Sequence, residues 1–279
     1  MEKLPTIHHS FIVQNDSLGK LFSQVACGIL SVLYAKRSGY KIILHTNDES
    51  AKYLDIAPYD EIKLDLNGLE NGYGEYVFAY PKFKAYESMD LGDVHIDLDV
   101  FLKKPCITQF KDAIVQSIEQ VRLFSASKCW IESARAFANC QYPEHVKLCY
   151  DFMYNCGVCG INNGNLKEEY IKDYWYMMDQ YKKYGKIHKS VPDIIPEQQF
   201  LYDLVEYYNY DCQLVLPECS TKYADEIGYQ HLIGVSKRFC IGKVCERIYR
   251  LDKEIYFKLK NYWNELPNFI WPHYCVEQP

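Results

Sequence analysis

The sequence lacks an excess of positive charge, a long apolar run and a dinucleotide-binding glycine motif. Its 37 acidic residues outnumber its 31 lysines and arginines, which leaves a formal net charge of −6. Broad contact with nucleic acid needs a basic surface that neutralises phosphates, so we expect no nucleic-acid partner. No GxGxxG follows the first predicted strand, which argues against a Rossmann dehydrogenase.

Membrane-spanning and secretory signals are also missing. No apolar run reaches the roughly 18 residues that a transmembrane helix requires. Residues 1–9 contain no basic segment followed by an apolar core, so no secretory signal is expected. These observations predict a cytoplasmic protein without a transmembrane segment. Internal repeats, low-complexity tracts and a clear linker are absent from the sequence, so a single domain is the simplest expectation.

Cysteine, in contrast, is abundant, with 12 among 279 residues. The chain is far longer than a small disulfide-stabilised scaffold, and its cysteines stand within apolar stretches, which favours buried free thiols. Cys156 and Cys159 form a CxxC, but the downstream pair Cys240 and Cys245 has the wrong spacing for a zinc knuckle. Zinc or redox chemistry is therefore the less favoured interpretation.

Strand and helix signals alternate along the first part of the chain. Strands are predicted over Ile7–Val13, Lys41–His45 and Glu61–Leu66. Between the first two strands, apolar residues recur at helical spacing up to Gly39, and a short helix covers Glu49–Ile56. This β-α-β-α-β order predicts parallel strands with right-handed crossovers, whose ligands collect at the carboxyl edge of the sheet.

The rest of the chain mixes both kinds of element. A strand is predicted over Asp93–Leu102 and a final helix, with one apolar stripe, over Lys243–Tyr262. Between them we expect helices over Lys111–Gln120, Trp130–Ala138, Leu166–Tyr184 and Glu197–Tyr208, and a strand over Asp151–Val158. The sequence therefore predicts the α/β class.

Two carboxylates, Asp97 and Asp99, interrupt the apolar strand predicted over Asp93–Leu102. Burying unpaired charge on one face of a strand is costly, and a bound divalent cation removes that penalty. Hard oxygen ligands in an open site suit Mg²⁺ or Mn²⁺, which also accept phosphate oxygens as ligands. The alternative is a strand end whose acids point into solvent.

A second motif, HxxGxxK, is formed by His231, Gly234 and Lys237. An imidazole can be a third metal ligand, glycine lets backbone approach a phosphate, and lysine supplies a positive charge for that phosphate. Alone, such a pattern is more often an ordinary turn with surface side chains. Its occurrence together with the acidic pair makes the phosphate-binding interpretation stronger.

These motifs resemble those of GT-A glycosyltransferases. Asp97-x-Asp99 is similar to their DxD, and the segment from His231 to Lys237 is similar to the HxxGxxK element of glycosyltransferase family 8. Three further segments resemble regions in families 8 and 32: Lys82-Phe83-Lys84-Ala85, Asn155-Cys156-Gly157 and Pro196-Glu197-Gln198-Gln199. The elements follow the family order through most of the chain. One departure is Arg238-Phe239, which replaces the Pro-Trp that follows the family 8 lysine.

The resemblance implies roles for individual residues. Asp97, Asp99 and His231 would hold Mn²⁺ or Mg²⁺, and the two acids would count among the catalytic residues. The nucleotide sugar would be bound by Phe11, Gln14, Lys84, Asp97, Asn155, Gly157, Gly234 and Lys237. Phe11 and Gln14 lie at the end of the first strand, where a uracil ring could sit, yet packing explains them equally well. Glu197 would act as base, nucleophile or acceptor ligand, although an acid also stabilises a helix N-terminus.

The implied fold is a single GT-A domain with a Rossmann-like mixed sheet flanked by helices. Its nucleotide-binding part would cover about residues 1–105, its acceptor part about 106–245, and a C-terminal helix 243–262. The implied activity is retaining transfer of a sugar from a UDP-linked donor to a glycan or lipid-linked acceptor in bacterial polysaccharide biosynthesis. Peripheral contact with the inner membrane face stays open. The alternatives are an inactive nucleotide-sugar-binding protein of the same fold and, less favoured, a DxD phosphohydrolase.

Overall fold

The computed structural model describes residues 3–13, 17–69, 79–121, 126–147, 151–185, 193–217, 220–232, 236–267, 269 and 271. The chain forms two compact units, each composed of segments that are distant in sequence. Unit 1 contains Met1–Leu66, Asp97–Thr108 and Thr221–Pro279, and unit 2 contains Asn67–Ile96 and Gln109–Ser220. Both units combine helices with strands, which confirms the predicted α/β class.

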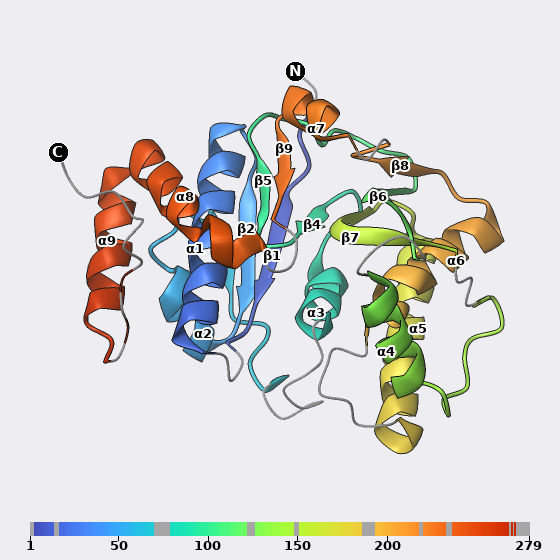
Figure 1. Ribbon diagram of the computed structural model, residues 1–279. Coiled ribbons are helices and arrows are strands. Elements are labelled where there is room, and N and C mark those ends of the chain that lie inside the picture. Colours follow the sequence, from blue (N-terminus) through green and yellow to red (C-terminus); the bar gives the residue numbers. More distant parts are fainter. Residues whose placement is uncertain are drawn as a thin grey trace. The chain divides into compact units, whose positions relative to one another are not determined.

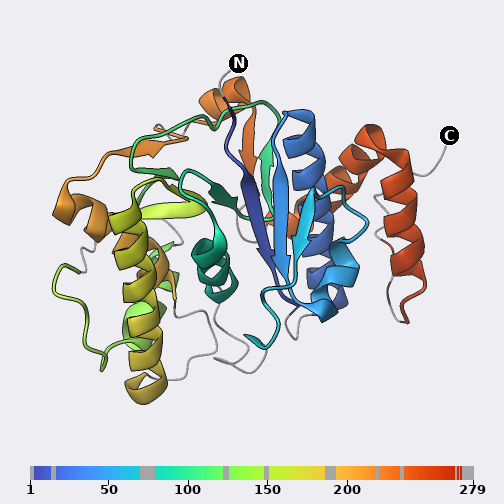
Figure 2. The ribbon, with the colours of Figure 1, turned by 180° about the vertical axis from the view of Figure 1, so that it is seen from behind.

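Unit 1 is built on three parallel strands in the order β3-β2-β1, connected through two helices (Figures 1 and 2). The strands are β1 (Ile7–Phe11), β2 (Ile42–Thr46) and β3 (Glu61–Lys63), and the helices are α1 (Leu18–Arg37) and α2 (Asp48–Leu54). Nearly every residue of β1 and β2 is buried, as expected for parallel strands that are covered on both faces. The predicted β-α-β-α-β order is confirmed.

Helix α1 is the long apolar element of unit 1. It is N-capped by Ser17, whose side chain accepts the Lys20 backbone N–H, and it ends before Gly39, whose φ of 87° suits glycine. By length and composition this helix could cross a membrane, which differs from the expectation that no such run exists. Within the fold, however, 67% of its apolar window is buried, and the helix packs against β2, α2 and other elements of unit 1. The helix therefore has the burial of a core helix.

The later segments of unit 1 add a two-stranded antiparallel sheet and three helices. The strands are β5 (Val100–Leu102) and β9 (Tyr229–His231), and the helices are α7 (Thr221–Ile227), α8 (Ser236–Leu251) and α9 (Lys253–Asn264). The single helix predicted over residues 243–262 is thus two helices. Asp252 separates them because its backbone is extended and its side chain accepts the Ile255 N–H as the N-cap of α9.

Unit 2 contains a mixed sheet in the order β4-β7-β6-β8. Its strands are β4 (Val94–Ile96), β6 (Ala113–Gln120), β7 (Phe152–Ile161) and β8 (Cys212–Leu214). Strand β7 is antiparallel to β4 and β6, whereas β6 and β8 are parallel. The helix predicted over Lys111–Gln120 is wrong, since β6 occupies this stretch. A short buried apolar run shows neither the helical nor the strand period, so the pattern alone cannot distinguish the two. The β-branched residues of β6 suit a strand.

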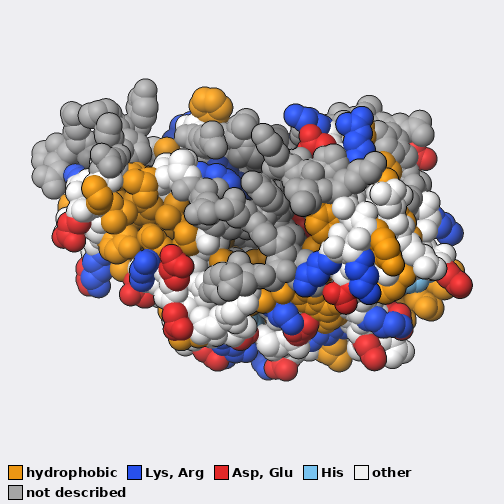
Figure 3. Space-filling model, turned by 90° about the horizontal axis from the view of Figure 1, so that it is seen from below, with side chains coloured by type: hydrophobic (Ala, Val, Ile, Leu, Met, Phe, Trp, Pro, Cys, Tyr) orange, Lys and Arg blue, Asp and Glu red, His pale blue; other side chains and the backbone are white. Residues whose placement is uncertain are grey.

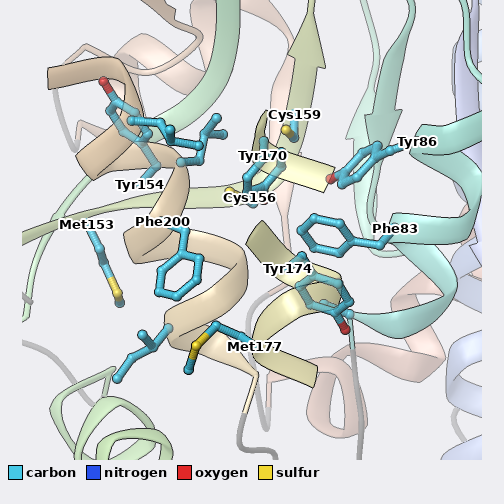
Figure 4. Packing of buried hydrophobic residues seen from close by; sticks show 14 of the residues in the cluster. Phe83, Tyr86, Met153, Tyr154, Cys156, Cys159, Tyr170, Tyr174, Met177 and Phe200 are labelled. Carbon is cyan, nitrogen blue, oxygen red and sulfur yellow. The ribbon is translucent and has the colours of Figure 1, made fainter. Parts of the chain in front are cut away.

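Helices pack around an aromatic core in unit 2 (Figure 4). They are α3 (Tyr80–Ser88), α4 (Ala126–Ala136), α5 (Gly164–Tyr184), a π-helical turn η2 (Ile195–Gln199) and α6 (Phe200–Tyr208). Phe83 of α3 stacks on Tyr174 of α5 with ring centroids 3.4 Å apart. Cys156 and Cys159 of β7 are buried in this core, and both are free thiols.

Candidate metal site

The two predicted metal-binding carboxylates lie on a tight turn. The strand predicted over Asp93–Leu102 is in fact two strands, β4 and β5, and the chain passes from unit 2 to unit 1 between them. The Val100 N–H donates to the Asp97 carbonyl at 2.9 Å and closes the turn. The turn, rather than the alternation of a continuous strand, therefore holds Asp97 and Asp99 together.

Strand β9 brings His231 to this turn. Its antiparallel register with β5 places His231 opposite Val100, and the Leu232 N–H donates to the Asp99 carbonyl at 3.1 Å. The two strands are thereby fixed at the end where the acids lie. As a result, His231 Nε2 is 3.4 Å from Asp99 Oδ2, although the two residues are far apart in sequence.

Asp97, Asp99 and His231 form a cluster that could hold a metal ion. One ligand atom from each residue lies within 4.8 Å of the others. Two carboxylates and an imidazole are ligands that Mn²⁺ and Mg²⁺ accept, and unfilled coordination positions would remain for phosphate oxygens. The convergence that the sequence predicts is present, and metal binding itself stays a prediction.

Lys237, in the first turn of α8, completes the charge arrangement. Its Nζ lies 2.8 Å from Asp99 Oδ2, and the Asp99 side chain is only 4% exposed. Burial raises the pKa of Asp99, but hydrogen bonds and charges from His231 and Lys237 outweigh burial and lower this pKa to about 2. Asp99 is therefore an anion at neutral pH and can act as a metal ligand.

The sequence model of one protein family, described as a family of unknown function (DUF6734), matches residues 22–265. This range covers more than half of the chain and includes the acidic turn, His231 and Lys237. The chain belongs to the DUF6734 family. Among the curated proteins, none matches the chain.

The other predicted residues of unit 1 are less informative. Phe11 ends β1 of the DUF6734 chain and is 4% exposed, so it belongs to the core of the unit. Gln14 and Gly234 lie outside the described residues. Within the described part of HxxGxxK, His231 ends β9 and Lys237 lies in the first turn of α8.

Lys84, Asn155 and Gly157 have structural partners within unit 2 of the DUF6734 protein. Lys84 Nζ lies 2.8 Å from Glu87 and 4.7 Å from the centre of the Trp175 ring. Asn155 accepts the Gly157 N–H at 2.9 Å and donates to Glu119 at 2.5 Å. These bonds support an irregularity in the pairing of β6 with β7. Packing and turn geometry therefore suffice to explain these three residues, and their nucleotide-binding roles stay predictions.

Glu197 lies in the π-helical turn η2 and forms a buried ion pair with Lys82. The distance from Lys82 Nζ to Glu197 Oε1 is 2.6 Å, and the side chains are 7% and 3% exposed. The sequence interpretation singled out Lys84 and missed Lys82. A signal was present, because helical spacing places Lys82 on the same side of α3 as the buried Tyr86. A catalytic role for Glu197 stays a prediction.

Asp193 is a second buried acid near Glu197 in the DUF6734 fold. It is 0% exposed and accepts the Ala79 N–H at 2.5 Å. Burial, followed by the charge of Glu197, raises the pKa of Asp193 from 3.8 to about 7. The folded state therefore keeps the Asp193 proton over a pH range in which the unfolded chain releases it.

We expect this raised pKa to make stability depend on pH. The stabilising contribution of protonated Asp193 is complete below 3.8 and is lost as the pH rises towards about 7. Urea unfolding of the wild type should show a decrease on the order of 2–4 kcal/mol across this window, and Asp193→Asn should flatten it. Asp179→Asn, which changes an exposed acid of α5, is the control and should keep the wild-type profile. Identical profiles for Asp193→Asn and the wild type would refute this assignment.

Proposed function

We propose that this DUF6734 protein is a metal-dependent glycosyltransferase that uses a nucleotide-diphosphate sugar, with a UDP-sugar as the expected donor. The observation that carries the proposal is the cluster of Asp97, Asp99 and His231 beside Lys237 at the start of a helix. The resemblance to glycosyltransferase families 8 and 32 connects this arrangement with sugar transfer.

The residues of the cluster fit the chemistry of sugar transfer. A divalent cation held by Asp97, Asp99 and His231 would neutralise the diphosphate that leaves during the reaction. Lys237 would donate a hydrogen bond to a phosphate oxygen and add a second positive charge. The N-terminus of α8 supports the same role, because its backbone N–H groups and dipole favour anions.

The proposal includes an acceptor class and a location. A glycan or lipid-linked acceptor in bacterial polysaccharide biosynthesis follows from the family resemblance, as does retention of configuration, and the cytoplasmic location is carried over from the sequence expectations. Acidic and basic side chains alternate over the face shown in Figure 3, where no broad basic area gathers among the described residues.

Thermal unfolding with UDP, with Mn²⁺ and with both tests the proposal. We expect UDP to raise the melting temperature strongly only when Mn²⁺ is present, because the cation links the acids to the diphosphate. Release of UDP from UDP-sugars should likewise require Mn²⁺. Binding without UDP release would favour the inactive nucleotide-sugar-binding alternative. No stabilisation by any nucleotide, with or without Mn²⁺, would rule out the proposed function.

Lys237→Met should change the affinities for Mn²⁺ and for UDP in opposite directions. Lys237 and a metal ion share Asp99, since the lysine contacts Oδ2 at 2.8 Å. Without the lysine, Mn²⁺ alone should bind several-fold more tightly, while UDP in the presence of Mn²⁺ should bind roughly 10–100-fold more weakly because a charged hydrogen bond is lost. Isothermal titration measures both affinities. Lys243→Met, an exposed lysine of α8, is the control and should change neither affinity.

A further inference from the structure

Ser31 of helix α1 and Ser38, the C-cap residue after that helix, both hydrogen-bond to strand β5. Ser31 Oγ donates to the Val100 carbonyl at 2.6 Å, and Ser38 Oγ donates to the Leu102 carbonyl at 2.7 Å. Ser31 lies within α1 and Ser38 directly follows its last residue, Arg37, and both hydroxyls reach the same strand. The two bonds are alike in chemistry, but the Ser31 bond lies next to the acidic turn and the Ser38 bond lies at the far end of β5.

The peptide groups of Val100 are held on both sides. The Val100 N–H donates to the Asp97 carbonyl and closes the acidic turn, while its carbonyl accepts the Ser31 hydroxyl. A displacement of the Val100 backbone would therefore also move the preceding residue, Asp99. The hydroxyl of Ser31 thus sits one residue away from a predicted metal ligand without contacting the metal position itself.

A buried chain of hydrogen bonds leads to Ser31. His9 Nε2 lies 3.1 Å from Ser31 Oγ, and His9 Nδ1 lies 2.8 Å from the Tyr59 hydroxyl. Ser31 gives its only hydroxyl proton to Val100, so it accepts from His9 Nε2–H, which leaves Nδ1 to accept from Tyr59. Burial, as the largest cause, lowers the pKa of His9 to about 3. The imidazole is therefore neutral, and the network selects one tautomer.

We infer that Tyr59, His9 and Ser31 are positioning residues for the metal site, acting through the Val100 carbonyl. This inference rests on the proposed function, because it assumes that Asp97 and Asp99 bind a cation. Groups that orient metal ligands from behind typically change metal affinity about 10–100-fold when they are removed. The hydrogen-bond series Tyr59–His9–Ser31 ends at the Val100 carbonyl beside the acidic turn. It is also shielded from water, since both His9 and Ser31 are 0% exposed.

The two serines provide a matched test. Mn²⁺ affinity is measured from the free-ion EPR signal for the wild type, Ser31→Ala and Ser38→Ala, with thermal unfolding recorded for each protein. Both variants lose one serine-to-carbonyl bond to strand β5, from within α1 for Ser31 and from its C-cap for Ser38. Ser31→Ala should weaken Mn²⁺ binding about tenfold or more, whereas Ser38→Ala should stay within about twofold of the wild type because its bond lies away from the turn.

A second pair of variants separates positioning from general stability. His9→Gln keeps an N–H that can donate to Ser31, and His9→Leu does not. We expect His9→Gln to retain more Mn²⁺ affinity than His9→Leu, and this pair carries the test if Ser31→Ala does not fold. If the wild type binds Mn²⁺ tightly, equal Mn²⁺ affinities of the two serine variants, or of the two His9 variants, would overturn this inference but not the proposed function. A wild-type protein that binds no Mn²⁺ would overturn the proposed function as well.

Discussion

Asp99→Asn is expected to abolish Mn²⁺ binding and to lower Mn²⁺-dependent UDP-sugar turnover by roughly 1000-fold or more, since a catalytic cation contributes several kcal/mol. Asp99 is the centre of the cluster, because both His231 and Lys237 contact its Oδ2. An amide has no charge to attract the cation. Isothermal titration with Mn²⁺ and an assay of UDP release measure the two effects.

Asp225→Asn is the matched control for Asp99→Asn. Asp225 is an exposed acid on α7 in the same unit, so its change removes the same charge away from the cluster. It should bind Mn²⁺ and release UDP like the wild type. Circular dichroism must show that Asp99→Asn is folded. A folded Asp99→Asn protein with wild-type Mn²⁺ affinity is incompatible with the assigned metal ligands.

Lys82→Met is expected to lower the free energy of unfolding by about 3–5 kcal/mol, because it leaves the buried carboxylate of Glu197 without its partner. The pair is nearly shielded from solvent, and Lys82 Nζ lies 2.6 Å from Glu197. Such a loss is a large part of the stability of a typical domain. Urea unfolding of the variant against the wild type measures it.

Lys84→Met, two residues along the same helix, is the control for the buried pair. Lys84 also contacts a glutamate, Glu87, but its side chain is 32% exposed and the partner is 37% exposed. Exposed ion pairs contribute about 1 kcal/mol or less. Adding Glu197→Gln to Lys82→Met should recover part of the stability, since no uncompensated charge remains. Equal losses of unfolding free energy in Lys82→Met and Lys84→Met would show that burial does not determine the contribution of the Lys82–Glu197 pair.

The first parallel strands and their helices were predictable from sequence because their signals are local. Helix α1 has a serine cap, a regular apolar period and a terminal glycine in the left-handed conformation. The convergence of His231 with the acids was predictable only through motif spacing and family resemblance. Nothing in the local sequence requires β9 to pair with β5.

The errors arise where long-range contacts decide the structure. The turn at Asp97–Asp99 depends on pairing between β5 and β9, and the buried run of β6 looks helical until its neighbours in the sheet are known. The role of Lys82 depends on a partner 115 residues away in sequence. The link from Tyr59 through His9 to Ser31 joins the connection before β3 with strand β1 and helix α1, so no single segment could reveal it.

The most direct test of the central claim is an EPR titration of the wild-type protein with Mn²⁺, with and without UDP. The account predicts a single bound Mn²⁺ per chain, held more tightly when UDP is present, and lost on His231→Ala as well as on Asp99→Asn. A titration in which Mn²⁺ remains free under both conditions would contradict it.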